Sequence, residues 1–115
     1  MPRSRSFAAL PDPSRSARLF AALGDETRLR IVSRLCREGP LSITNLTAGS
    51  DVTRQAVTKH LRLMEQTGLV GHARHGRESV WQLHQKRLED ARRYLAQISK
   101  QWDDILERLR DFVEK

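Results

Sequence analysis

Residues 53–67 place side chains that can form hydrogen bonds, several of them cationic, along one side of an expected helix. At about 100° per residue, Val57, Leu61 and Met64 fall within a narrow arc that would face a core. The opposite side is polar and carries Arg54, Gln55, Thr58, Lys59, Arg62 and Glu65. In a DNA major groove, glutamine pairs with adenine, and arginine or lysine pairs with guanine. We therefore expect Gln55 and either Arg54 or Lys59 to read bases, and Arg62 to hold a phosphate.

Both ends of this helix are marked in the sequence. Thr53 is expected to cap the N-terminus, and Val52 before it can pack onto Val57, four residues into the helix. Gly68 is expected to adopt a left-handed conformation that ends the helix, with Leu69 placed to touch a residue of the last turn. The predicted helix therefore has a defined start and a defined end.

A β-hairpin is predicted from Val70 to Leu83, around a turn at His75 and Gly76. With a two-residue turn, Val70 pairs with Trp81, and Val70, Trp81 and Leu83 share the buried face. Three cationic or titratable side chains then lie at the tip: Arg74, His75 and Arg77. Clustered cations repel one another unless an anion binds them, and phosphates or a narrow minor groove would supply that negative charge.

Two helices are expected before residue 40. The first begins at Pro13 after an Asp12 N-cap and ends at Gly24, and the second begins after Asp25 and ends before Gly39. Their expected inner faces are Ala17, Phe20 and Leu23 in the first helix, and Leu29, Val32, Leu35 and Cys36 in the second. Residues 1–11, rich in serine and arginine, are predicted to form a flexible tail.

A short helix capped by Ser42 is expected next, broken near Gly49. The hydroxyl and N–H groups of Ser42 and Thr44 at its start could contact phosphate. Two short helices, a capped helix with a polar face and a hairpin with a basic tip together make a winged helix-turn-helix. We expect residues 12–85 to form this domain, and the fold to be mainly α with a small β-hairpin.

The last predicted helix, residues 86–115, carries apolar side chains at alternating intervals of three and four residues, which is typical of a coiled-coil seam. A helix of about 28 residues would extend about 42 Å, too far to be buried against one small body. We expect this seam to form a homodimer interface, the alternative being a helix folded back onto its own core. The seam residues are Leu88, Ala91, Leu95, Ile98, Trp102, Ile105, Leu109 and Phe112.

Composition limits the class of protein. The chain has 115 residues, a net charge of +7 and 38% hydrophobic residues, as expected for one small folded domain. Residues 1–88 hold fifteen basic and seven acidic side chains, which predicts a polyanionic partner for this part of the chain. No apolar run is long enough to cross a membrane, and the single Cys36 fits a reducing compartment. We expect a cytoplasmic protein with no membrane partner.

Four segments within residues 15–85 together resemble a known family: LGDETRLRIV (23–32), GPLSITNL (39–46), VTRQAVTKHLRLMEQTGLV (52–70) and RHGRESVWQL (74–83). The resemblance is to the ArsR/SmtB type of bacterial regulator. It implies a homodimeric winged-helix regulator, usually a repressor, that binds an inverted-repeat operator. It also implies that Thr53 through Arg62 form the recognition helix and that Arg74 through Arg77 form the wing.

Many members of this family release DNA when they bind a metal ion, but this sequence departs from their ligand motifs. Residues 41–48 contain no Cys-x-Cys pair, and the last helix has Asp103, Asp104 and Glu107 but no histidine. Soft metals need several converging thiolate or imidazole ligands. We therefore expect no metal site and no cofactor, and we expect Cys36 and His60 to be packed residues. The second half of the last helix resembles a subgroup of the family without recognisable metal ligands.

Other classes of function fit the sequence less well. An enzyme is not expected, because the sequence has no phosphate loop, no paired metal ligands and no nucleophile with an assignable base. RNA binding is disfavoured because an RNA major groove is too deep and narrow for the polar helix. The main alternative is a protein–protein adaptor that uses the winged fold and the seam without DNA. A protein-binding face would more often expose aromatic residues than cations.

Overall fold

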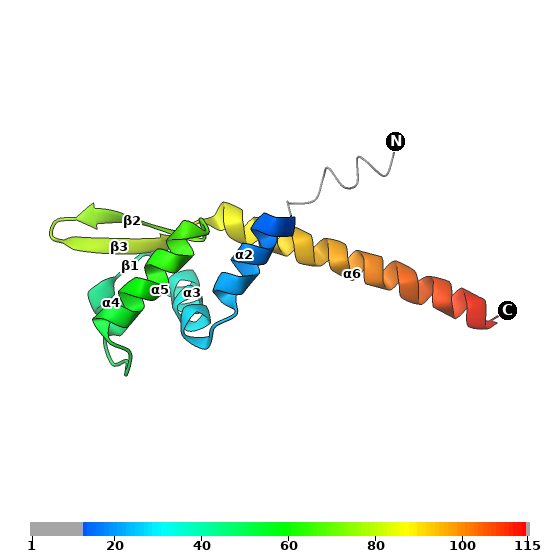
Figure 1. Ribbon diagram of the computed structural model, residues 1–115, viewed down its shortest axis with the longest axis horizontal. Coiled ribbons are helices and arrows are strands. Elements are labelled where there is room, and N and C mark those ends of the chain that lie inside the picture. Colours follow the sequence, from blue (N-terminus) through cyan, green and yellow to red (C-terminus); the bar gives the residue numbers. More distant parts are fainter. Residues whose placement is uncertain (1–12, 115) are drawn as a thin grey trace.

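A computed structural model describes residues 13–114 of the chain. The predicted tail (1–11), the predicted Asp12 cap and Lys115 lie outside the described residues. Figure 1 shows the helices and strands that follow one another along the described part. They are α2 (Pro13–Leu23), α3 (Glu26–Glu38), β1 (Leu41–Ser42), α4 (Ile43–Thr47), α5 (Arg54–Gln66), β2 (Val70–His75), β3 (Glu78–Leu83) and α6 (Gln85–Glu114).

The ends of α3 and α5 are formed as the sequence predicts. The side chain of Asp25 accepts the N–H of Arg28 at 3.0 Å, and the hydroxyl of Thr53 accepts the N–H of Ala56 at 3.1 Å. At the end of α5, Gly68 has a φ of 78°. The N–H of Gly68 donates to the carbonyl of Glu65, and the N–H of Leu69 donates to the carbonyl of Met64. This pair of bonds is a Schellman motif, so α5 stops at a defined residue.

The sheet has three antiparallel strands in the order β1-β3-β2. The expected winged helix-turn-helix fold is confirmed, with one strand more than the predicted hairpin. The additional strand β1 pairs Leu41 with Trp81 and Ser42 with Val80. A strand of two residues is too short to show an alternating pattern, which is why the sequence did not reveal it.

The predicted register of the hairpin is wrong. Val70 pairs with Leu83, two residues from the predicted partner Trp81, and Trp81 pairs with His72. The two residues between the strands are Gly76 and Arg77, and in this turn only Gly76 has a positive φ, 65°. Glycine at the first of two turn positions is typical of a type II′ turn. Because the shift is an even number of residues, Val70 and Trp81 remain buried on the same face, as predicted.

The core lies between the helices of the body and the sheet, and α5 contributes the predicted Val57, Leu61 and Met64. The predicted inner face of α3 is partly wrong, because Leu29 is 50% exposed and Cys36 is also exposed. Buried residues of α3 are Ile31, Val32 and Leu35. The inward position one turn before them is held by the polar residue Arg28, which donates to the carbonyl of Ala22 at 2.7 Å. Hydrophobic spacing alone cannot reveal such a position.

The same effect shifts the inner face of α2 by one residue. Its buried residues are Ser16, Leu19 and Ala22, while the predicted Ala17 is exposed. The predicted Phe20 and Leu23 are half-buried at the edge of the core. A serine at a buried position breaks the apolar pattern that the prediction relied on.

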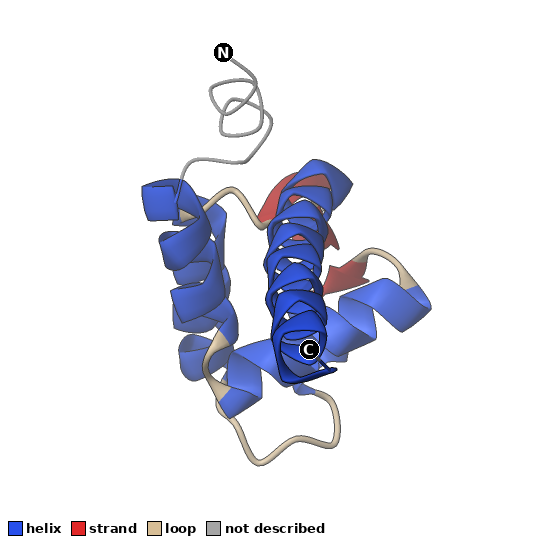
Figure 2. Cartoon of the chain, turned by 90° about the vertical axis from the view of Figure 1, so that its right-hand side faces the viewer, coloured by secondary structure: helices blue, strands red, loops and turns tan. Residues whose placement is uncertain are grey.

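Helix α6 leaves the body after its first turns. Leu88 packs against the core and Ala91 is buried, so these two predicted seam positions contribute to the core of their own chain. The molecule measures 66 × 30 × 21 Å, and Figure 1 shows α6 projecting far beyond the other elements. Figure 2, which looks along α6 from its C-terminal end, shows the strands lying behind it. Within residues 13–114, no helix has both the length and the apolar character needed to span a membrane.

The projecting part of α6 exposes its apolar residues. They include the predicted Leu95, Ile98, Trp102, Ile105, Leu109 and Phe112, together with Leu106 and Val113, which the heptad pattern did not include. Leu106 and Val113 each follow a seam residue directly, so the apolar face is wider in the last part of α6 than a two-position seam. In a single chain this face is in contact with solvent.

Candidate nucleic-acid interface

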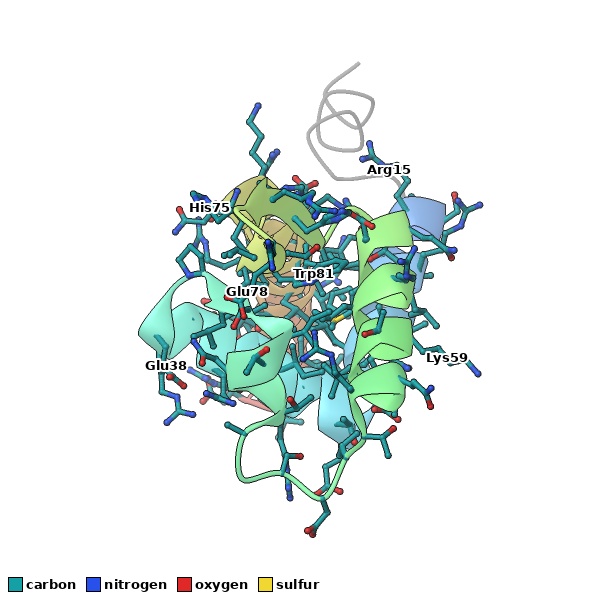
Figure 3. All side chains as sticks on the ribbon, turned by 90° about the vertical axis from the view of Figure 1, so that its left-hand side faces the viewer. Arg15, Glu38, Lys59, His75, Glu78 and Trp81 are labelled. Atoms are coloured by element: carbon teal, nitrogen blue, oxygen red, sulfur yellow. The ribbon has the colours of Figure 1, made fainter. Side chains whose placement is uncertain are left out.

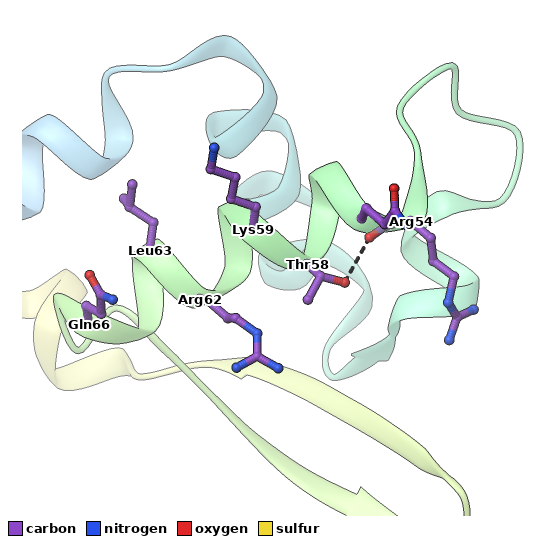
Figure 4. Close-up of a pocket in the computed structure, with 7 residues that line it drawn as sticks. Arg54, Thr58, Lys59, Arg62, Leu63 and Gln66 are labelled. Carbon is purple, nitrogen blue, oxygen red and sulfur yellow. Dashed lines mark hydrogen bonds between the residues drawn. The ribbon is translucent and has the colours of Figure 1, made fainter.

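The outward side of α5 presents the polar residues predicted for it. Arg54, Gln55, Lys59 and Arg62 are exposed, and Thr58 is half-buried. A shallow groove follows this side of the helix and is lined by Arg54, Gln55, Thr58, Lys59, Arg62, Leu63 and Gln66. In Figure 4, Arg54, Thr58 and Arg62 point to one flank of α5, while Lys59 and Leu63 point to the other. The groove therefore has a flank on the side of the wing and a flank on the opposite side.

Leu63 and Gln66 are residues of this groove that the sequence interpretation did not include. Leu63 is 38% exposed and follows Lys59 by one helical turn on the same surface. An apolar side chain on a polar helix face can contact the methyl group of thymine in a major groove. The leucine side chain forms no hydrogen bonds, so only its angular position on the helix indicates that it lies on the outward side.

The start of α5 is tied to α4. Nη1 of Arg54 donates to the hydroxyl oxygen of Thr44 at 3.0 Å, and the hydroxyl of Thr58 donates to the carbonyl of Arg54 at 2.8 Å. Thr53, which caps the helix, is exposed beside them. These contacts hold Arg54 against α4, so its guanidinium and the Thr44 hydroxyl form one polar unit at the N-terminal end of the groove.

Ser42 does not present its hydroxyl to a ligand as predicted. Its side chain is buried, and its hydroxyl oxygen accepts the N–H of Asn45 at 3.1 Å as the N-cap of α4. Ser42 also belongs to β1, where it pairs with Val80 of the neighbouring strand. The exposed Thr44 is therefore the hydroxyl that remains accessible at the start of α4.

The tip of the wing carries the predicted cluster of cations. Arg74, His75 and Arg77 are all exposed. His75 pairs with Glu78 across the end of the hairpin, and Arg77 lies in the turn. Figure 3 shows Lys59 on the side of α5 and His75 on the wing, with Trp81 between them in this view. The outward side of α5 and the tip of the wing are thus two separate basic surfaces.

The cations of these two surfaces lack acidic partners. In the described part of the chain, the ion pairs of arginine lie on α3 and α6, where Arg30, Arg34, Arg87 and Arg92 pair with neighbouring carboxylates. The hydrogen bond from Arg34 lowers the pKa of Glu38, for example. Arg54, Lys59, Arg62, Arg74 and Arg77 have no such partner within residues 13–114. Their charge is therefore available to an external polyanion.

Glu65 does not join the outward face of α5, although the sequence interpretation placed it there. Its Oε2 lies 2.6 Å from Nδ1 of His72, the third residue of β2. The ring of His72 in turn stacks on Trp81, with centroids 4.5 Å apart and planes inclined by 33°. The single carboxylate of α5 is thus turned toward the base of the wing.

The remaining histidines and Cys36 do not form a metal site with one another. Within residues 13–114, no group of three or more histidine, cysteine, aspartate or glutamate side chains is placed to hold an ion. Nδ1 of His60 lies 3.1 Å from Nη1 of Arg28, and Nδ1 of His84 lies 3.1 Å from the carbonyl oxygen of Gly68. His60 is half-buried, as expected, whereas Cys36 is on the surface of α3.

Known proteins are similar to this chain in sequence and in geometry. A family model described as a helix-turn-helix domain matches residues 23–72. An uncharacterized HTH-type transcriptional regulator of Bacillus subtilis, YuzN, is 38% identical over 68 residues, which is 54% of this chain and 74% of YuzN. A Synechocystis protein named as a transcriptional repressor SmtB homolog is 35% identical over 75 residues, 65% of this chain and 56% of that protein.

Solved structures match most of this chain. An ArsR-like transcriptional regulator from Rhodococcus sp. RHA1 superposes with a TM-score of 0.75 and 34% identity, covering 86% of this chain and 92% of that one. With the helix-turn-helix match and the relatives above, this superposition shows that the chain belongs to the ArsR/SmtB family of winged helix-turn-helix transcriptional regulators.

Proposed function

We propose that this chain represses transcription by binding an inverted-repeat operator as a homodimer. The observation that carries the proposal is the pair of unneutralised basic surfaces on α5 and on the wing. The outward side of α5 enters the major groove, and the tip of the wing contacts the adjacent minor groove or the DNA backbone. The name of the Synechocystis relative supports repression as the outcome. The proposed function implies that the chain acts in the cytoplasm.

Individual residues of α5 take different roles in this proposal. Gln55 pairs with adenine and Lys59 with guanine, because both side chains are exposed near the N-terminal half of the helix. Arg54, held by Thr44, and Arg62 on the same flank contact phosphates and set the register of the helix on DNA. At the wing, Arg74 and Arg77 supply further cationic contacts.

The exposed face of α6 supports self-association. A monomer would leave the apolar residues from Leu95 to Val113 in water, which is unfavourable for a contiguous patch. A second copy of α6 carries the same face, and a two-fold axis lets each helix cover the other. Leu88 and Ala91, which pack in their own chain, lie at the edge of this interface.

The charges of α6 favour an antiparallel pairing of the two copies. Residues 85–102 hold five basic and two acidic side chains, whereas residues 103–114 hold two basic and five acidic ones. A parallel pair would place like charges side by side, and an antiparallel pair places each basic half beside the acidic half of its partner. The seam then repeats about residue 100, which brings Ile98 opposite Trp102 of the partner subunit.

This pairing sets the distance between the two points where the bodies join α6. In a pair centred on residue 100, the two Ala91 residues are 18 positions apart along the helix axis, or about 27 Å, and the two Leu88 residues are about 36 Å apart. Successive major grooves on one face of B-DNA are about 34 Å apart. The points at which the two bodies join α6 are therefore about one helical turn of B-DNA apart.

Selection from random DNA tests the proposal. The full chain is incubated with a library of random 30-base-pair duplexes at about 0.15 M salt, and bound duplexes are amplified and sequenced over several rounds. We expect an inverted repeat with half-sites about 10 base pairs apart, centre to centre. A variant in which Arg54, Lys59 and Arg62 are all alanine is the control and should enrich nothing. If the unmodified chain also enriches nothing, the proposal fails and the protein–protein adaptor is favoured.

A further inference from the structure

We propose that Glu65 and His72 are positioning residues that set the angle between the wing and α5, and so determine whether Arg74 and Arg77 reach DNA. The inference rests on the proposed DNA binding. It begins from the contact between Glu65 Oε2 and His72 Nδ1, at 2.6 Å, which joins α5 directly to β2. Neither residue lines the groove on the outward side of α5.

The identity of Glu65 supports a role other than DNA contact. It is the one acidic residue of α5, and a carboxylate that faced phosphates would repel them. The contact with His72 turns it toward the wing instead. The ring of His72 is held on its other side by Trp81, a buried residue of β3, at a centroid distance of 4.5 Å. A chain of three side chains thus runs from the recognition helix through the base of the wing into the core.

Beyond His72, the wing is held by few contacts with other elements of the fold. From His72 to Glu78 the hairpin is exposed, and the neighbouring strand β1 pairs with β3 only at Trp81 and Val80. The turn residue Gly76 is four residues beyond His72, or about 13 Å at 3.3 Å per residue. A rotation of about 10° at the base would move the tip by about 2 Å, more than a hydrogen bond to a phosphate tolerates. The contact at the base therefore controls the contacts at the tip.

Coupling between the base and the tip tests the inference. The affinity for the selected operator and its dependence on salt are measured for the chain with and without the pair Arg74→Ala and Arg77→Ala. The same pair is then introduced into Glu65→Ala, Glu65→Gln and His72→Phe.

The His72→Phe variant keeps an aromatic ring on Trp81 but lacks the nitrogen, and Glu65→Gln keeps an oxygen acceptor. Glu78→Gln, which removes a carboxylate at the wing without touching the contact, is the matched control.

In the unmodified chain and in Glu78→Gln, we expect the arginine substitutions to weaken binding about tenfold or more. We also expect them to flatten the slope of log affinity against log salt by about 0.9 for each phosphate that the wing no longer neutralises. In Glu65→Ala and His72→Phe the same arginine substitutions should reduce the affinity for the operator by less than about threefold. In Glu65→Gln they should again reduce the affinity by most of the amount seen in the unmodified chain. An equal cost in every background would overturn the inference. If the arginine substitutions leave the affinity unchanged even in the unmodified chain, the wing does not bind DNA, and it is the proposed function that fails.

A measurement without DNA separates orientation from binding. Residual dipolar couplings of the amides of Ala73, Gly76 and Val80, referred to those of α5, report the angle of the wing in the free protein. We expect Glu65→Ala and His72→Phe to change or average these couplings while the couplings within α5 stay as they are. Couplings of the wing that are identical in all variants would overturn the inference even if the protein remains folded.

Discussion

Nε of Arg87, in the first turn of α6, donates to the backbone carbonyl oxygen of Thr67 at 3.0 Å. Thr67 caps the C-terminus of α5. The same guanidinium pairs with Asp90 at 3.0 Å and donates to the carbonyl of Arg15 in α2 at 3.3 Å, and its side chain is only 11% exposed. One arginine with little solvent exposure therefore links the helix proposed to read DNA to the helix proposed to hold the dimer.

Replacing Arg87 by methionine should destabilise the protein by about 1–3 kcal/mol, because the aliphatic part is kept while three hydrogen bonds, two of them partly buried, are lost. Urea denaturation at a fixed protein concentration measures this change. Arg110→Met, an exposed position on α6, is the control and should change the free energy of unfolding by less than about 0.5 kcal/mol. Equal urea midpoints for the two variants would show that the hydrogen bonds of Arg87 do not contribute to the free energy of unfolding.

Replacing Gln55 by alanine should reduce affinity for the selected operator by about 1–3 kcal/mol, since the bidentate hydrogen bonds to one base are removed. Binding to random duplex should hardly change, because that binding comes from phosphate contacts. Fluorescence anisotropy on both duplexes makes the comparison, with Gln97→Ala on α6 as the control. A reduction of the same size on both duplexes would mean that Gln55 reads no base.

Replacing Ile98 by aspartate should shift the protein to monomer and abolish operator binding at low concentration. The two-fold axis brings two carboxylates into the desolvated seam, at a cost of several kcal/mol. Sedimentation equilibrium gives the assembly state. Ala96→Asp adds the same charge at an exposed position outside the seam and should remain dimeric. An Ile98→Asp protein that stays dimeric and binds normally would exclude the proposed interface.

The N-cap of α3 should make the free energy of unfolding depend on pH in the acidic range. The hydrogen bond from the Arg28 N–H to Asp25 holds the pKa of that carboxyl below its usual value of about 4. A lowered pKa in the folded state stabilises the fold fully above pH 4–5, and this stability is lost as the pH falls through the folded pKa. Glu38 and Glu89, whose pKa values are lowered by hydrogen bonds from Arg34 and Arg92, act in the same direction.

Urea denaturation between pH 7 and pH 2.5 measures this dependence. Asp25→Asn keeps a capping oxygen but cannot titrate, so its free energy of unfolding should fall less steeply in acid than that of the unmodified chain. Asp103→Asn, at an exposed position on α6, is the control. Parallel curves for Asp25→Asn and the unmodified chain would contradict the assignment.

Gly71→Ala should destabilise the base of the wing through one particular neighbour. A Cβ at this position would lie 2.5 Å from Nε2 and 2.8 Å from Cε1 of His84, so the imidazole must move away from the carbonyl of Gly68. Because His84 is exposed and its side chain can rotate, we expect a loss of no more than about 1 kcal/mol in thermal or urea denaturation, from the hydrogen bond to Gly68. In a His84→Ala background the added methyl group has room, so the same substitution should cost much less. An equal cost in both backgrounds would assign the loss to the backbone of β2.

Local signals made most of the helices predictable. The ends of α3 and α5 depend on residues within one turn of each end, Asp25, Thr53 and Gly68, and all three behave as expected. The register of the hairpin was less well determined, because a turn at His75-Gly76 and a turn at Gly76-Arg77 leave Val70 and Trp81 on the same face. Hydrophobic spacing could not distinguish the two turns.

The parts that could not be predicted depend on contacts between elements. Polar residues at inward positions, Ser16 and Arg28, moved the buried faces of α2 and α3, since each is satisfied or enclosed only in the folded chain. The outward face of α5 followed from periodicity, but the turning of Glu65 toward His72 did not. The sequence separation of seven residues contains the end of a helix and a turn, so no regular period relates the two side chains.

The fluorescence of the two tryptophans reports on two different changes, one in the wing and one in the assembly of α6. Trp81 is 3% exposed beside the base of the wing, and Trp102 is 59% exposed on α6. The emission of Trp81 is sensitive to the stacked imidazole of His72, and that of Trp102 to the polarity of its surroundings, which changes when a second α6 covers it. Replacing either tryptophan by phenylalanine therefore leaves a chain whose intrinsic fluorescence follows one process alone, wing geometry or assembly, without an attached dye.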